Sequence, residues 1–304
     1  RSRIDSDNIC TVAGPVWGEC QASRVPPMFR RPAMLLLLCV PLLHGAGDGE
    51  AEDRGTDSAT GRSAADIARA TLERRENRSL YFRGERIFDR QCVHCHGTTG
   101  RGNGPWAATM VTKPRNLRSG IFKFRTTPYG KLPSDADLRR TIRSGVSGTA
   151  MPAFTKMTDA ELDGIVAFVQ NLSRRWRDET LYANPIPLPE PPAWVKKEDA
   201  QGGHVARGKT LFGKLCASCH GAEGKGDGLA SKGLVDVWEN PIKPADLTGE
   251  HHKSGDRPED LYRSIATGLD GTPMIGFHGT LEPTQIWDLV GFIRSLASSE
   301  ATED

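Results

Sequence analysis

Two short segments of the sequence place thiols and an imidazole at a spacing that can do chemistry. Residues 92–96 read Cys-Val-His-Cys-His and residues 216–220 read Cys-Ala-Ser-Cys-His, so both have the pattern Cys-x-x-Cys-His. On a helix, positions i, i+3 and i+4 share one face, and the two thiols and the ring therefore point the same way. This pattern is the attachment sequence of a c-type haem, in which the thiols bond to the porphyrin and the histidine binds the iron. The sequence thus predicts two covalently bound haem c groups on these residues: Cys92, Cys95 and His96, and Cys216, Cys219 and His220.

A Cys-x-x-Cys pair can also bind zinc or act as a redox dithiol. Neither pair has a second metal-binding pair beside it in the sequence, and a redox dithiol needs no histidine directly after it. The repetition of the whole pattern also favours haem attachment over both alternatives.

The sixth coordination position of a haem iron decides whether the iron transfers electrons or binds small molecules. Met274 is the only methionine after residue 220, and Met151 is its counterpart in the first half; they follow the motif histidines by 54 and 55 residues. A thioether sulfur in this position favours ferrous iron and raises the reduction potential, which suits an electron carrier. We therefore expect Met151 and Met274 to be the axial ligands. The rival candidates are Met110 and Met157 in the first half and His251, His252 and His278 in the second.

The motifs lie in two long segments, residues 80–180 and 204–304, that resemble each other at an offset close to 124 residues. Matched residues keep the same order along both segments: Gly100, Gly102, Gly104, Lys113, Pro114, Leu117, Arg140, Gly145, Phe154 and Phe168 correspond to Gly224, Gly226, Gly228, Lys243, Pro244, Leu247, Arg263, Gly268, Phe277 and Phe292. The chain is therefore expected to contain two tandem domains of one fold.

Apolar residues at helical spacing predict the same helices in both domains. A helix over 81–95 leads into the first motif, and one over 205–216 leads into the second. Shorter helices at 134–144 and 257–267 precede the methionines, and each ends at a glycine where a left-handed cap is expected. The last helices have apolar faces over 162–172, after a capping box of Thr158 and Glu161, and over 286–296. The expected fold class is all-α.

The remaining segments surround these two domains. Residues 28–46 combine a basic start, a short apolar run and small residues, which is typical of an export signal, and residues 1–27 are interpreted as an upstream extension without function. Residues 47–79 form a polar tail that is expected to be helical over 64–77. Five prolines between 185 and 192 indicate that residues 181–203 are a stiff, Pro-rich linker. The longest apolar run is too short to span a bilayer, so we expect an exported, periplasmic protein without membrane insertion.

With these motifs, each domain resembles a class I cytochrome c, and the whole chain resembles the exported dihaem c-type cytochromes built from two such domains. The resemblance implies that the first and last helices of each domain pack together and that one haem edge is exposed for electron exchange. It also implies that His96 and Met151 bind the first iron and that His220 and Met274 bind the second.

The resemblance suggests further contacts around each haem. In this family a proline carbonyl after the motif often accepts a hydrogen bond from the motif histidine; Pro105 stands at that place in the first domain, whereas the second domain has Leu229. Arg140 and Arg263 occupy equal positions, where each could pair with a haem propionate or be an ordinary solvated helix arginine.

The implied function is transfer of single electrons in the periplasm, by a soluble carrier or by a subunit of a respiratory or dehydrogenase complex, rather than an enzymatic reaction. The expected partners are redox proteins: a donor dehydrogenase or quinol-oxidising complex and an acceptor oxidase or reductase. The alternative is a dihaem enzyme, such as a peroxidase or a thiosulfate-oxidising cytochrome, in which one axial ligand is labile.

The two domains carry opposite net charge. Residues 80–180 contain 17 Lys and Arg against 9 Asp and Glu, whereas residues 204–304 contain 10 against 15. Two explanations stay open: the asymmetry steers different partners to the two domains, or it attracts the domains to each other. Nucleic acid is not an expected partner, because the basic residues are dispersed and the protein is expected to be exported.

Overall fold

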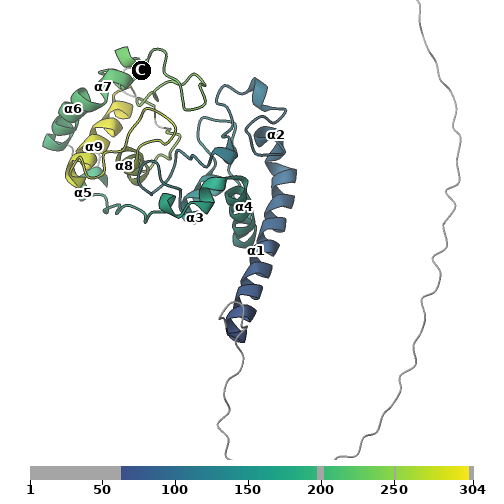
Figure 1. Cartoon of the computed structure of the whole chain (residues 1–304). Helices are drawn as coiled ribbons and strands as arrows, with labels where there is room; N and C mark the ends of the chain where they lie inside the picture. The colour runs from purple at the N-terminus through teal and green to yellow at the C-terminus, as the bar shows by residue number, and fades with distance from the viewer. Residues whose placement is uncertain (1–62, 197–201, 250, 301–304) are drawn as a thin grey trace, which may run out of the picture. The chain divides into compact units, whose positions relative to one another are not determined.

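Helices and the loops between them make up residues 63–196, 202–249 and 251–300, which are the residues described in a computed structural model of the chain (Figure 1). Within these ranges the β-type pairings are a bridge residue at Ser63 and two isolated bridges in the second domain. The predicted all-α fold class is therefore confirmed. The upstream extension, the export signal and the tail up to residue 62 lie outside the described residues.

The two domains repeat one order of helices: a first helix, a one-turn motif helix, a short third helix and a last helix. In the first domain these are α1 (Ala64–Gln91), α2 (Val93–His96), α3 (Asp135–Ser144) and α4 (Asp159–Leu172). In the second they are α6 (Gly202–Leu215), α7 (Ala217–His220), α8 (Pro258–Thr267) and α9 (Pro283–Glu300). The helix α5 (Ala193–Lys196) precedes the second domain, and the loops contain the 3-10 turns η1 (Ala107–Thr109), η2 (Leu117–Ser119), η3 (Arg174–Arg177), η4 (Glu179–Leu181) and η5 (Leu229–Ser231).

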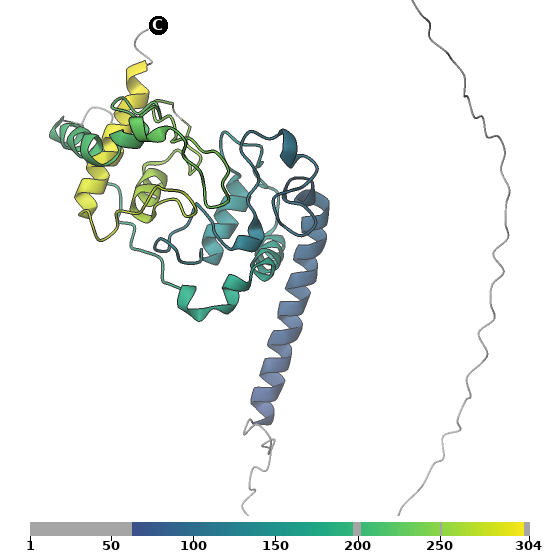
Figure 2. The ribbon, with the colours of Figure 1, turned by 45° about the horizontal axis from the view of Figure 1, so that its top comes forward.

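Helix α1 is longer than the sequence pattern predicts, because the helices expected at 64–77 and 81–95 are one continuous helix that ends before Cys92. Ser63 caps its start, where the serine hydroxyl accepts a hydrogen bond of 3.1 Å from the backbone N–H of Asp66. No proline lies between the two expected helices, so nothing in the chain interrupts the backbone ladder. The turns before residue 80 are mostly exposed and project away from the first domain in both views (Figures 1 and 2).

The first and last helices of each domain pack against each other, α1 with α4 and α6 with α9 (Figure 1), and a glycine lies at each crossing. A Cβ atom on Gly84 of α1 would lie 2.0 Å from the carbonyl oxygen of Gly164 on α4. A Cβ atom on Gly208 of α6 would lie 2.0 Å from the carbonyl oxygen of Asp288 on α9. Only glycine allows backbones to approach this closely. The packing of first against last helix that the resemblance implies is present in both domains.

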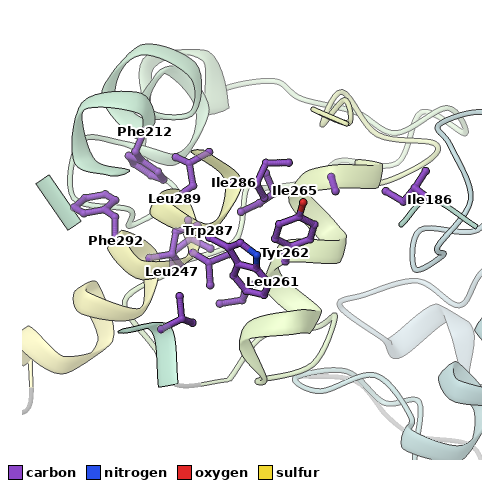
Figure 3. Close-up of a cluster of buried hydrophobic side chains, with 14 residues drawn as sticks. Ile186, Phe212, Leu247, Leu261, Tyr262, Ile265, Ile286, Trp287, Leu289 and Phe292 are labelled. Carbon is purple, nitrogen blue, oxygen red and sulfur yellow. The ribbon is translucent and has the colours of Figure 1, made fainter. Parts of the chain in front are cut away.

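An aromatic pair lies in the core beside each crossing. Phe88 of α1 meets Phe168 of α4 with ring centroids 4.9 Å apart, and Phe212 of α6 meets Phe292 of α9 at 5.1 Å. Figure 3 shows the second pair together with Leu289, which is completely buried. These matched pairs fill the same place in the two domains and hold the first helix against the last helix.

The helices α3 and α4 begin at caps of the kind that the sequence predicts. Thr158 and Glu161 form the expected capping box, and Ser134 and Asp137 form a second one. The glycines after α3 and α8 differ from the expected left-handed cap, since Gly145 has φ 68° and ψ −164° and Gly268 has φ 70° and ψ −179°. This positive φ with extended ψ is almost exclusive to glycine, and it directs the chain out of the helix straight into the methionine loop.

The Pro-rich linker packs against both domains instead of running free between them. The backbone N–H of Ile186 donates to the carbonyl of Thr126 in the first domain at 2.8 Å, while the Ile186 side chain lies in the core of the second. Trp194 on α5 stacks on the ring of His204 with centroids 3.9 Å apart, and Val195 is buried in the same core. All described residues belong to one compact unit of the chain, so the linker is part of the fold.

We expect Gly208→Ala to destabilise the second domain by about 3 kcal/mol or more, because the added methyl group forces α9 away from α6. Gly213→Ala is the matched control on the same helix, since nothing lies within 4 Å of the added methyl group there. This variant should be neutral or stabilising by about 0.5–1 kcal/mol, because alanine favours the helix. Denaturant unfolding of the holoprotein measures both, and equal effects of the two variants would contradict the close crossing.

Candidate functional site

Each motif forms one helical turn that begins at its first cysteine. Cys92 lies between α1 and α2 with φ −113°, and Cys216 lies between α6 and α7 with φ −119°. The backbone N–H of His96 donates to the carbonyl of Cys92 at 2.9 Å, and that of His220 donates to the carbonyl of Cys216 at the same distance. The two thiols and the ring of each motif therefore come from a single turn.

The four cysteines of the motifs are free and half-buried. Burial raises the pKa of the Cys92 thiol to about 12 and that of the Cys216 thiol to about 11. A redox dithiol has a lowered thiol pKa instead, so this alternative loses support. The zinc alternative also loses support, because the described residues contain no group of three His, Cys, Asp or Glu side chains placed to hold a metal ion.

A backbone carbonyl fixes each motif histidine. The ring Nδ1 of His96 is 3.0 Å from the carbonyl oxygen of Arg115, and that of His220 is 3.1 Å from the carbonyl oxygen of Ala245. A carbonyl accepts only from an N–H, so Nδ1 carries the proton and Nε2 keeps a free lone pair. Burial lowers the pKa of both rings, although the backbone hydrogen bond opposes it. Burial thus favours the neutral form of both histidines, which is the form that binds a metal.

The expectation that Pro105 supplies this carbonyl is wrong. The acceptor residues, Arg115 and Ala245, directly follow Pro114 and Pro244. They lie in loops later in the sequence that fold back onto the motif. The difference between Pro105 and Leu229 therefore has no consequence for the histidines. The repeated Lys-Pro pairs at 113–114 and 243–244 were the available signal, because they lie at matched positions immediately before both acceptors.

The glycines after each motif allow the loop that contains the acceptor carbonyl to lie against the motif. The backbone N–H of Gly102 donates to the carbonyl of His96 at 2.8 Å, and the matched bond of Gly226 to His220 is equally long. Gly102 has φ 77°, and a Cβ atom on it would lie 2.4 Å from the carbonyl oxygen of Pro114. The repeated glycine spacing of the sequence is thus explained by the close approach of the loop that contains the acceptor carbonyl.

The two methionines lie in loops with the same hydrogen bonds. The backbone N–H of Val146 donates to the carbonyl of Met151 at 3.1 Å, and the hydroxyl of Thr149 donates to the carbonyl of Val146 at 2.8 Å. The second domain repeats both bonds, at 2.9 and 2.7 Å, with Leu269, Thr272 and Met274. The backbone N–H of each methionine donates to the hydroxyl of its loop threonine. Both methionine side chains are half-buried, and their ligation stays a prediction.

Most rival ligands have other roles in the structure. Met157 is 9% exposed and packs into the core of the first domain. The ring Nδ1 of His251 is 3.0 Å from the carboxylate of Asp256, and the backbone N–H of His252 donates to the same carboxylate at 2.8 Å. The other two are half-buried Met110, at the end of a 3-10 turn, and exposed His278, after the second methionine loop.

A cavity of about 700 Å³ lies beside Met151 and is lined by residues of both domains, including Arg140 and Arg263. Each arginine also pairs with a carboxylate three residues earlier in the chain, Asp137 or Asp260, at 2.7 Å. A guanidinium has five N–H groups, so these bonds leave donors for a further acid group. Pairing of the two arginines with haem propionates stays a prediction.

The donor sets of both domains fit a covalently attached haem. Each offers two free thiols and one carbonyl-bound imidazole on the same turn, and a thioether sulfur in a half-buried loop. The same set of contacts occurs twice in one chain, which a chance arrangement would not produce.

Two protein-family models match the chain, one in each domain. Residues 81–169 match "Cytochrome C oxidase, cbb3-type, subunit III", and residues 205–297 match "Cytochrome c". The matches begin shortly before each motif and end within each last helix, so they cover the two domains separately.

Longer relatives match both domains together. A cbb3-type cytochrome c oxidase subunit CcoP of an Azospirillum species is 29% identical over 71% of this chain and 62% of its own length, so this chain spans less than two thirds of that relative. A cytochrome bc1 complex cytochrome c subunit of Mycobacterium leprae is 24% identical over 73% of this chain and 74% of its own length. Among solved structures, a chain of the reducing HAO-like protein complex of Kuenenia stuttgartiensis is 34% identical, with a TM-score of 0.62, over 70% of this chain and 95% of that one.

Thr272→Val is expected to weaken the second methionine loop by about 1 kcal/mol, because it removes the hydroxyl that donates to Leu269 and accepts from Met274. Thr149→Val should act in the same way on the first loop only. Hydrogen exchange of the two methionine backbone N–H groups measures the effect, which should be faster exchange in the altered domain alone. Thr280→Val, at an exposed position after the second loop, is the control, and a matching change in that variant would contradict the assignment.

Proposed function

Since the chain belongs to the dihaem c-type cytochromes, we propose that it carries single electrons between redox proteins in the periplasm, as a soluble carrier or as a subunit of a respiratory or dehydrogenase complex. The observation that supports this most directly is the repetition of one ligand arrangement, with a carbonyl-bound imidazole and a hydrogen-bonded methionine loop in each domain. A pair of filled coordination positions suits electron transfer rather than substrate binding.

The two domains hold two covalently bound haem c groups, and we assign their contacts by residue. Thioether bonds form at these thiols: Cys92 and Cys95 for the first haem and Cys216 and Cys219 for the second. The iron ligands are His96 with Met151 and His220 with Met274. The haem supplies the couple between ferric and ferrous iron. A backbone carbonyl accepts a hydrogen bond from the Nδ1–H of each histidine, which orients the ring and raises its basicity as a ligand.

The relatives support respiratory complexes as partners. Two of them are named as subunits of a cbb3-type oxidase and of a bc1 complex, so we propose an oxidase and a bc1-type or dehydrogenase complex as acceptor and donor. The periplasmic location rests on the export signal proposed for residues 28–46. In the part of the chain that the structure describes, no helix has the length and apolar character that a membrane span requires.

Met274→Leu in the holoprotein is expected to lower the reduction potential of the second haem by on the order of 100 mV, because axial ligands set haem potentials over a range of about 0.8 V. The ferrous iron of that haem should then bind carbon monoxide, and Met151→Leu should do the same for the first haem. Potentiometric titration and carbon monoxide difference spectra measure both effects.

Met157→Leu is the control for these variants, since it alters a methionine of nearly the same volume that lies in the core. It should leave both potentials and the resistance to carbon monoxide unchanged. Carbon monoxide binding by the unaltered protein at one haem would favour the dihaem enzyme instead, and a mass showing fewer than two attached haems would reject the proposal.

Electron transfer to a charged partner is expected to slow as ionic strength rises, if the opposite charges of the two domains steer encounters. Stopped-flow rates with a small acidic and a small basic redox protein measure this, and the acidic partner should show the steeper dependence because the basic first domain carries the larger net charge. A flat dependence for both would leave attraction between the domains as the only role of the charges. Arg125, which reaches Asp270 in the second domain, already gives that second role structural support.

A further inference from the structure

The two methionine loops have the same internal hydrogen bonds but different surroundings. Residues 267–271, at the start of the loop of Met274, are all buried except the half-buried Leu269, whereas the matching residues 144–148 are half-buried or exposed. The first loop borders the cavity of about 700 Å³. A duplicated domain gives no reason for this difference, so its cause lies in what covers each loop.

Arg125 of the first domain packs against the loop of Met274 and is 0% exposed. Its guanidinium donates to the carbonyl of Thr267 at 3.0 Å and to that of Gly268 at 3.3 Å. These are the last residue of α8 and the first residue after it. A cation at the carboxyl end of a helix satisfies the unpaired carbonyls and complements the helix dipole. Arg125 therefore fixes the point where the methionine loop leaves the helix.

Asp270 explains how this charge is tolerated in the interior. Its carboxylate lies 4.0 Å from Nε of Arg125. Burial lowers the pKa of Arg125, and the nearby carboxylate opposes that effect. A buried cation without a partner would be strongly destabilising, so the arginine and the second methionine loop depend on each other.

Two neighbours of Arg125 extend the contact further along the loop. The hydroxyl of Tyr129 donates to the carbonyl of Thr272 at 3.0 Å, and the backbone N–H of Gly130 donates to the carboxylate of Asp270 at 3.2 Å. Thr272 is the residue whose hydroxyl closes the loop of Met274. The first domain thus contacts the second methionine loop at three places: at Thr267 and Gly268, at Asp270 and at Thr272.

The contact is one-sided because the two domains differ in length at this place. The chain takes 23 residues from Leu117 to Arg140 but only 16 between their counterparts Leu247 and Arg263. The longer segment contains Arg125. The shorter one lines the cavity beside the first methionine loop without filling it.

We propose that Arg125 is a positioning residue that locks the loop of Met274 from the neighbouring domain, so that the methionine of the second haem is displaced much more slowly than that of the first. The inference rests on the proposed function, because it takes both methionines as axial ligands. It makes the first domain the place where an external ligand reaches iron, while the second haem stays closed as long as the domains remain docked.

The test follows displacement of methionine by imidazole in the ferric holoprotein, through the weak long-wavelength absorption band that methionine sulfur gives on ferric haem. The unaltered protein should show a fast and a slow phase of similar amplitude. In Arg125→Met the slow phase should accelerate about tenfold or more, because hydrogen bonds from a charged group to two carbonyls are lost. The fast phase should keep its rate, and Arg125→Lys should restore part of the slow one. Hydrogen exchange at the backbone N–H groups of Leu269 and Met274 should become faster in Arg125→Met, which gives a readout independent of haem absorption.

Arg118→Met is the matched control, since Arg118 is an exposed arginine at the start of the same segment and its loss should change neither phase. Tyr129→Phe removes only one hydrogen bond at a side chain that is 44% exposed, and it should accelerate the slow phase about fivefold even if Arg125→Met does not fold. The proposal is overturned if the slow phase is unchanged in the variants that fold, or if both phases accelerate equally. Failure of the proposed function is recognised separately: Met151→Leu, which leaves methionine only at the second haem, would then lack the band altogether.

Discussion

The hydrogen bond from the ring of each motif histidine to a backbone carbonyl constrains everything around it. The bond joins residues 19 positions apart in the first domain and 25 apart in the second. The loop between them must therefore fold back onto the motif. It lies so close to the motif that Gly102 and Gly226 have no room for a Cβ atom. The same bond places the ring proton on Nδ1, so the motif is held ready for metal before any cofactor is attached.

The contact between the domains reaches this histidine support as well as the second methionine loop. The guanidinium of Arg115, whose carbonyl holds His96, lies over the ring of Trp238 in the second domain, 4.2 Å from its centroid. Burial lowers the pKa of Arg115 to about 10, while Asp236 and Asp270 oppose the effect. Cations of the basic domain are thus buried against carboxylates of the acidic one. Part of the charge asymmetry in the sequence is accounted for by this interface.

Local patterns predicted the elements whose causes are local. The motif turn, the capping box at Thr158 and the apolar faces of the last helices all depend on neighbours within a few residues, and the structure contains them. The acceptor carbonyls, by contrast, depend on how the chain returns to the motif, and the family pattern that pointed to Pro105 does not show where the chain returns. The packed linker and Arg125 are further cases, because a proline-rich composition and a single arginine look the same whether they face solvent or a neighbouring domain.

Duplication and divergence act on different levels of this molecule. The bonds within the motifs and within the methionine loops are nearly identical in the two domains, so the proposed ligands give the two haems no reason to differ. What differs is the environment: the loop of Met151 borders a cavity lined by Arg140, Lys253 and Arg263, whereas the loop of Met274 lies against a buried arginine and its carboxylate. Reduction removes one positive charge from a haem iron, so the charged groups around each haem shift its reduction potential. Two haems with the same proposed ligands can therefore differ in electron affinity through their surroundings, and the segments of unequal length between matched residues shape those surroundings.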